Sequence, residues 1–284
     1  MGEELEKILL DNNEIINFKK MFANLKEKRP EYAEVLGTLF ESSSYLNPQN
    51  VSNYSSYLVI GGYAVLLNLI KKAQELYKNT GLEKYSAENI ILKWRGSHDV
   101  DLVGDETSEK KLPSHIFNQF ESSNHNLVKT KKCSFNYVGP TKNKESEGIH
   151  GDIYIIPFGK KVKIANAEFE RDYETGFKHE TVNLYGINIF IPKVSDLIKS
   201  KITDFKDEKT IEQIYEKIKN KRQRDLVDII NIINSSDSKL NFNEFNEKER
   251  QLVEFIYKTG KKFSEEMFFK DIYLNNKMKI SWQK

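Results

Sequence analysis

Apolar and polar positions along the chain follow two periods, and the change from one to the other marks the predicted elements. Leu58-Val59-Ile60 is a short, mostly β-branched apolar run, which predicts a buried strand. From Tyr63 to Tyr77 apolar residues recur every three or four positions, which predicts a helix. Gly61 and Gly62 lie between the two. The most strongly patterned part of the chain therefore begins with a strand, a glycine pair and a helix.

The glycine pair is a candidate phosphate-binding turn. Glycine adopts positive φ and lets the backbone approach a ligand closely. The start of a helix offers unpaired N–H groups and a partial positive charge, which suit a phosphate. We therefore expect Gly61 and Gly62 to bind the phosphates of a nucleotide. A plain tight turn is the alternative, because a glycine pair alone is a weak motif.

The next informative stretch is an apolar strand that carries two acids, Asp99 and Asp101. Alternate residues of a strand point to the same face, so the two carboxylates are expected side by side. Carboxylates in that arrangement repel each other unless a cation lies between them. Oxygen ligands at this spacing suit Mg²⁺, which leaves coordination positions open for substrate phosphates. The alternative is an edge strand with two solvated acids.

These two stretches together resemble a known family. Ile60-Gly61-Gly62-Tyr63-Ala64 and Arg95-Gly96-Ser97-His98-Asp99-Val100-Asp101-Leu102 are similar to motifs of the nucleotidyltransferase superfamily with the DNA polymerase β-like fold. The second motif resembles the AbiEii/AbiGii type IV toxin-like branch, with Ser97 in place of a threonine. The resemblance implies an α/β fold whose core is a mixed sheet, flanked by N- and C-terminal helical regions. It also makes Arg95 a candidate phosphate contact and Ser97 a candidate hydrogen-bonding residue near the metal, although Arg95 is alternatively an ion-pair partner of the aspartates.

The resemblance implies a third carboxylate on a neighbouring strand. Ile149 to Phe158 alternates as an apolar strand and carries one acid, Asp152. In the superfamily such an acid binds metal or acts as general base for the incoming hydroxyl. The implied Mg²⁺ ligands, in a two-metal site, are therefore Asp99, Asp101 and Asp152. The alternative for Asp152 is an aspartate that accepts hydrogen bonds from backbone N–H groups at a strand start.

The C-terminal half contributes a candidate lysine and two further acids. Val194 to Ile202 is predicted to be a helix with Ser195 as N-cap, and by the resemblance Lys201 contacts the nucleotide phosphates. Asp225 and Asp228 follow a basic segment at helical i, i+3 spacing and share a face. We expect them to orient Lys201 or the site, with Asp225 in the nucleotide-binding set. The alternative is a solvated amphipathic helix with ordinary charge pairs.

The remaining elements complete three predicted regions: a helical arm over 1–50, a nucleotidyltransferase core over 51–195 and a helical region over 196–284. Further helices, strands and a hairpin are predicted over 112–120, 127–130, 134–138 and 181–191. Aromatic residues are frequent after residue 240, which predicts a tail that packs on the core.

Composition bears on three properties of the protein: membrane insertion, cellular compartment and nucleic-acid binding. Of 284 residues, 38% are hydrophobic and 30% charged, and no apolar run reaches membrane-spanning length. Cys133 is the sole cysteine, so an intramolecular disulfide is excluded and a reducing, cytoplasmic location is expected. The net charge of +2 neither requires nor excludes nucleic acid. A basic segment from Lys217 to Arg224 would favour RNA locally.

The resemblance implies a function that the residue pattern alone does not predict. We expect a magnesium-dependent enzyme that transfers NMP from an NTP to a hydroxyl of a tRNA 3′ end or a protein. Members of the branch often serve in toxin–antitoxin or phage-defence systems, which implies a cognate antitoxin as partner. Two other interpretations remain: a nucleotidyltransferase that modifies small molecules, of the aminoglycoside-modifying kind, and a catalytically inactive interaction module of the same fold.

Overall fold

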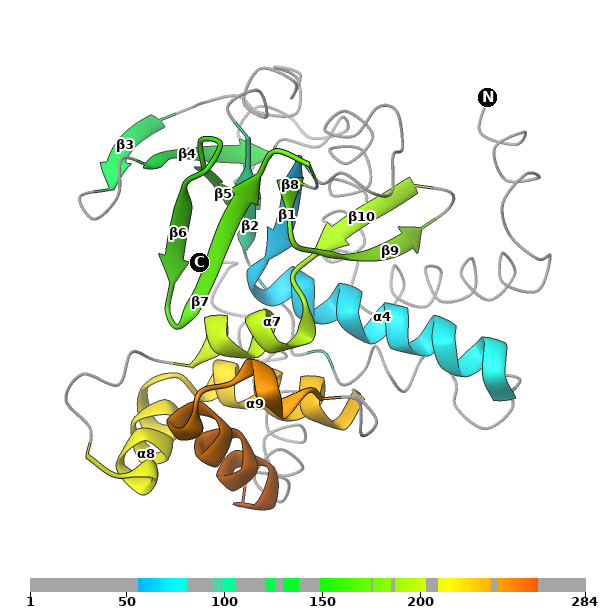
Figure 1. The fold of residues 1–284 in the computed structure, drawn as a ribbon, viewed down its shortest axis with the longest axis vertical. Coiled ribbons are helices and arrows are strands. Elements are labelled where there is room, and N and C mark those ends of the chain that lie inside the picture. The colour runs from blue at the N-terminus through cyan, green and yellow to red at the C-terminus, as the bar shows by residue number, and fades with distance from the viewer. Residues whose placement is uncertain are drawn as a thin grey trace, which may run out of the picture.

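A computed structural model describes residues 56–80, 94, 97, 99–105, 121–125, 130–137, 149–174, 176–184, 187–202, 209–235 and 240–259. The described part is a mixed α/β structure, in which strands and helices form separate layers (Figure 1). The predicted N-terminal arm over 1–50 and the predicted helix over 112–120 lie outside the described residues.

The main sheet has five strands in the order β1-β2-β5-β4-β3. Their bounds are Tyr57–Ile60 (β1), Asp99–Gly104 (β2), Glu121–His125 (β3), Thr130–Tyr137 (β4) and Ile149–Ile155 (β5). The pairs are antiparallel except β2 with β5, which is parallel. The mixed sheet that was expected is therefore present, and the two acid-bearing strands are its neighbours.

The strand predicted over 134–138 is confirmed for 134–137, but it begins earlier than expected, at Thr130. Residues 127–129 of the other predicted strand lie outside the described residues. A single strand, β4, pairs with β5 from Lys131 to Tyr137, and β3 was not expected. Lys131 and Lys132 interrupt the apolar pattern of the sequence. Strand pairing is made by backbone groups, so two lysines do not interrupt it.

Helix α4 (Gly61–Thr80) follows β1 directly and contacts the sheet. All four residues of β1 are buried, and so is almost every residue of α4 between Gly62 and Ile70. The first half of α4 is enclosed because α7 and α9 pack on it opposite the sheet (Figure 1). None of the helices in the described part is long and apolar enough to cross a membrane.

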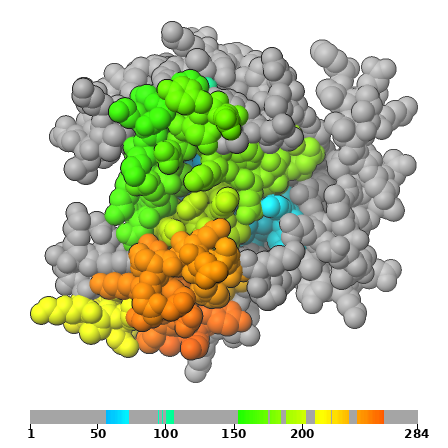
Figure 2. All heavy atoms as spheres, viewed as in Figure 1, coloured from blue at the N-terminus to red at the C-terminus, as the bar shows by residue number. Residues whose placement is uncertain are grey.

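Two smaller sheets lie beside the main one. Strands β9 (Glu180–Leu184) and β10 (Ile187–Ile191) form the predicted hairpin, which is confirmed. Strands β6 (Lys161–Ile164), β7 (Ala167–Asp172) and β8 (Gly176–Phe177) were not expected. Each is short, and charged residues alternate with apolar ones in β6 and β7, which weakens the sequence signal. Figure 2 shows the β6–β7 segment (green) at the viewed surface, next to the helical region (yellow and orange).

The C-terminal region is helical where it is described. Its helices are α7 (Val194–Lys201), α8 (Ile211–Lys221), α9 (Gln223–Ser235), a 3₁₀ turn η2 (Phe242–Glu244) and a helix over 247–259. Leu252, Val253 and Ile256 of the last helix are buried in the common core, so the prediction that the aromatic-rich tail packs on the core is confirmed for 240–259.

Ser195 is not the N-cap of α7. The cap position is Lys193, which makes no side-chain capping bond. Ser195 lies in the first turn, where its hydroxyl donates to the carboxylate of Glu244. The serine therefore joins α7 to η2 and leaves the first N–H groups of α7 uncapped by side chains.

Candidate functional site

The junction of β1 and α4 requires glycine for two reasons. Gly61 has φ +70°, a left-handed conformation that side chains with a Cβ adopt at a cost. A Cβ on Gly61 would also lie 2.8 Å from Oδ2 of Asp101. The predicted glycine turn is therefore tighter than expected, because Gly61 is itself the first residue of α4. The carboxylate of Asp101 reaches the start of the helix only because no side chain is present there.

The three predicted acids lie on two neighbouring parallel strands. Asp101 of β2 is the register partner of Asp152 of β5, and Asp99 of β2 is the partner of His150. Neighbouring strands are about 4.8 Å apart, so the backbones of Asp101 and Asp152 are adjacent. For Asp99 and Asp152, the structure describes the position of the backbone only. The strand register therefore brings together the positions that the resemblance implied, across a long separation in sequence.

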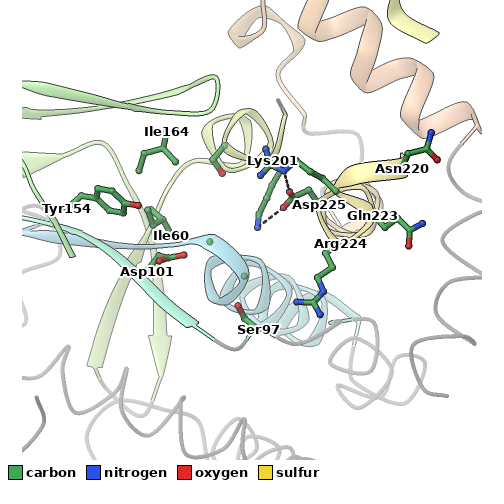
Figure 3. Close-up of a pocket in the computed structure, with 14 residues that line it drawn as sticks. Ile60, Ser97, Asp101, Tyr154, Ile164, Lys201, Asn220, Gln223, Arg224 and Asp225 are labelled. Carbon is green, nitrogen blue, oxygen red and sulfur yellow. Dashed lines mark ion pairs between the residues drawn. The ribbon is translucent and has the colours of Figure 1, made fainter. Parts of the chain in front are cut away.

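Asp101 and the start of α4 border a cavity of about 700 Å³. Its volume is within the range typical of small-molecule sites. One side, which we call the strand wall, consists of Ile60, Gly61, Gly62, Ser97, Asp101 and Tyr154. The opposite side, which we call the helix wall, consists of Ser200, Lys201, Asn220, Arg222, Gln223, Arg224 and Asp225. Ile164 of β6 completes the lining, and Figure 3 shows Asp101 and Lys201 on opposite sides.

Lys201 is held in the helix wall by two carboxylates. Its Nζ lies 3.0 Å from Oδ2 of Asp228 and 3.4 Å from Oδ1 of Asp225 (Figure 3 draws the second pair). Lys201 is 6% exposed, and Asp228 is fully buried. The other carboxylate oxygen of Asp225 accepts from Nε of Arg222 at 2.5 Å. The predicted proximity of both aspartates to Lys201 is confirmed, and the solvated-helix alternative is wrong for Asp228.

Ser97 is positioned by a pair of aromatic residues. The Tyr63 hydroxyl donates to the backbone oxygen of Ser97 at 3.4 Å, and the rings of Tyr63 and Trp94 are 5.2 Å apart. The indole N–H of Trp94 donates to the Gly62 carbonyl oxygen at 2.9 Å. These contacts anchor the chain that leads into β2 against the start of α4. Arg95, the candidate phosphate contact between Trp94 and Ser97, lies outside the described residues.

Several cavity residues were not expected from the sequence. Tyr154 belongs to the predicted strand of Asp152, but nothing in its pattern marks it as a site residue. Arg222 and Arg224 are part of the basic segment that was noted only as a local RNA-favouring surface. Part of the positive charge of that segment is neutralised within the chain, because Arg222 pairs with Asp225 and Lys219 lies 3.3 Å from Glu216. In Figure 3, Arg224 extends from α9 toward the side of the cavity that holds Ser97.

Comparison with known proteins adds no relative. No protein-family model matches the chain, and a search of curated proteins gives no match. Among the side chains that the structure describes, no group of three or more His, Cys, Asp or Glu residues forms a metal-binding cluster. That set does not include the side chains of Asp99 and Asp152.

Proposed function

We propose that this chain is a magnesium-dependent nucleotidyltransferase, which transfers NMP from an NTP to an acceptor hydroxyl and releases pyrophosphate. One observation carries the proposal. Asp101 is adjacent in register to Asp152, and its carboxylate lies against Gly61 at the start of α4. Asp101, an acid suited to a metal ion, and a helix start suited to phosphate thus border one cavity.

The donor set fits Mg²⁺. Asp99, Asp101 and Asp152 supply only oxygen, the ligand type that Mg²⁺ prefers, and no thiolate or imidazole is implied that would favour zinc. Because Gly61 has no side chain, the Asp101 carboxylate can lie against the start of α4. The chemistry that bound Mg²⁺ supplies is neutralisation of the triphosphate and stabilisation of the attacking and leaving oxygens.

The protein groups around the cavity have distinct roles in this proposal. The first N–H groups of α4, at Gly61 and Gly62, bind phosphate oxygens, and Lys201 faces them from the helix wall as a fixed positive charge. Asp152 accepts the proton of the acceptor hydroxyl. A bond then forms between the acceptor oxygen and the α-phosphorus, and the bond from that phosphorus to the pyrophosphate oxygen breaks.

The fold and the motifs support a finer assignment. The order of β1, α4 and β2, followed by a parallel acid-bearing strand, is consistent with the polymerase β-like fold. The segment from Arg95 to Leu102 resembles the AbiEii/AbiGii type IV toxin-like branch. We therefore propose that the acceptor is the 3′ end of a tRNA or a protein hydroxyl and that the chain acts as the toxin of a toxin–antitoxin or phage-defence pair.

The proposal is tested by nucleotide transfer. The full chain is incubated with Mg²⁺ and each α-³²P-labelled NTP, with and without total tRNA, alongside Asp101→Asn. We expect label on RNA or protein, its loss when EDTA removes the metal, and a decrease of at least about 100-fold in the variant, the size typical when an electrostatic transition-state contact is removed.

Asp196→Asn is a matched control, since Asp196 lies on α7 but does not line the cavity. It should label as the wild type does. Absence of label with every NTP, from protein whose circular dichroism shows that it is folded, would contradict the proposed acceptors. Equal labelling by Asp101→Asn and wild type would contradict the proposed site.

A further inference from the structure

Away from the cavity, three planar groups are stacked at the base of the β6–β7 hairpin. The guanidinium carbon of Arg171 lies 3.4 Å from the ring centroid of Phe158. The Phe158 ring is in turn stacked on the ring of Tyr173, with centroids 4.9 Å apart and planes 9° from parallel. Exposure rises through the stack from 2% at Arg171 to 37% at Phe158 and 76% at Tyr173. The outer layer is therefore an aromatic ring that faces solvent.

The inner part of the stack is fixed by the backbone. Gly159, with φ +64°, closes a turn in which the N–H of Lys160 donates to the carbonyl of Pro157 at 3.1 Å. The N–H of Gly159 donates to the carbonyl of Arg171 at 2.9 Å. Arg171 also lies 3.6 Å from the Asp105 carboxylate. Because its backbone and the guanidinium beneath it are fixed, the Phe158 ring loses little conformational freedom when a partner binds.

Packing within the chain does not explain Tyr173. About three quarters of its surface is exposed, so its contact with Phe158 removes little apolar area from water. Aromatic residues such as Tyr173 and Phe158, the two exposed members of the stack, are enriched where proteins bind one another. The stack therefore has the composition of a binding surface more than that of a stabilising cluster.

The charges beside Tyr173 indicate the chemistry of its partner. Asp172 and Glu174 flank it in the sequence, and the Asp172 carboxylate accepts from the N–H of Glu174 at 2.9 Å. The face of an aromatic ring is electron-rich and attracts cations. Two carboxylates strengthen that attraction and repel a phosphate backbone. Among protein cations, arginine is the one whose planar group stacks on a ring.

We propose that Tyr173, with Phe158 beneath it, is a docking site for a protein partner that presents an arginine. The guanidinium of the partner stacks on the outer face of Tyr173, and Asp172 and Glu174 attract it. The site is at the opposite end of the β6–β7 hairpin from Ile164, which lines the cavity. Six residues of extended chain span about 20 Å. The proposal does not depend on nucleotide transfer, because it uses none of the cavity residues.

The test measures binding of fluorescein-labelled 12-residue peptides to the full chain at low salt by fluorescence anisotropy. One peptide alternates arginine with glycine, a second replaces arginine by lysine, and a third replaces it by glutamate. We expect the arginine peptide to bind most tightly, the lysine peptide more weakly and the glutamate peptide not at all. Tyr173→Ala should weaken the arginine peptide about fivefold, the size of an exposed cation–π contact.

Matched variants separate this site from general charge. Tyr257→Ala removes another exposed tyrosine, on the helix over 247–259, and should leave binding unchanged. Tyr173→Phe should keep most of the affinity. The double variant Asp172→Asn/Glu174→Gln should weaken binding without removal of the ring, which tests the site even if Tyr173→Ala were to misfold.

Three results would overturn the proposal. In the first, no arginine peptide binds at all. In the second, Tyr173→Ala and Tyr257→Ala behave alike. In the third, a labelled oligothymidine binds more tightly than the arginine peptide and is lost in Tyr173→Ala, which would make the stack a nucleic-acid surface.

Discussion

The two walls of the cavity are built on different principles. The strand wall brings Asp101 to the start of α4, beside the acid-bearing strand β5. The helix wall contains two cations, Lys201 and Arg222, which are matched by Asp225 of the same wall and by the buried Asp228, which does not line the cavity. On the strand side, acidic positions lie on adjacent strands, whereas on the helix side carboxylates hold a lysine in place before any ligand arrives. Preorganised charge of this kind needs little rearrangement when a substrate binds.

The largest expected effect is on the helix wall. Asp228→Ala leaves the buried Lys201 ammonium without its nearer carboxylate, and we expect the free energy of unfolding to fall by about 3–5 kcal/mol. Urea denaturation measures it. Asp225→Ala is the comparison, since Asp225 is more exposed and its loss should cost about 1 kcal/mol. If Asp228→Ala cost no more than Asp225→Ala, the buried network would not be what stabilises this wall.

On the strand wall, comparing Gly61 with Gly159, which lies away from the cavity, separates the cost of backbone strain from that of contact with the Asp101 carboxylate. Gly61 and Gly159 both have positive φ, but nothing lies within 4 Å of a Cβ on Gly159. Gly159→Ala should cost about 1–2 kcal/mol through strain alone. Gly61→Ala should cost about 1–3 kcal/mol more, because it displaces the Asp101 carboxylate. Nucleotide transfer should fall in Gly61→Ala only. If urea denaturation gave equal losses of stability for Gly61→Ala and Gly159→Ala, displacement of the Asp101 carboxylate would have no energetic cost.

A smaller change tests how the strand wall is anchored. Tyr63→Phe removes the hydroxyl that donates to the Ser97 backbone and keeps the ring on Trp94. We expect the free energy of unfolding to fall by about 0.5–1 kcal/mol. The KM for NTP should rise while kcat changes little, if Ser97 helps to position the nucleotide. An unchanged KM would limit this hydrogen bond to a stabilising role.

The smallest expected effect is a pH dependence at the start of α7. Burial raises the pKa of Asp196, against the opposing influence of Lys199. An acid with a raised pKa stabilises the folded state below its ordinary pKa, and that contribution is lost as the pH rises through the raised value. Asp196→Asn should therefore be more stable than the wild type near pH 7, by about 0.5 kcal/mol or less. The difference should vanish in acid, which urea titrations from pH 3 to pH 7 would show.

Local elements were predictable, and their reasons are visible in particular residues. The strand before Gly61, the helix after it and the hairpin at 181–191 follow from apolar periods that a few neighbouring residues define. The hairpin of β6 and β7 was missed because its strands are short and half charged. The role of Trp94 beside the cavity was not predicted for another reason: its hydrogen bond to the Gly62 carbonyl joins segments that are distant in sequence.

The sequence by itself determined which residues are candidates for the proposed chemistry: a glycine pair before a helix, alternating acids on a strand, and a lysine with two later acids. It did so because side-chain period and backbone sterics act over a few residues. Only the tertiary structure decided that Asp152 is adjacent to Asp101, that Asp101 lies against Gly61, and that Asp228 is buried against Lys201. Strand register and helix packing depend on contacts between distant segments, and no local pattern encodes those contacts.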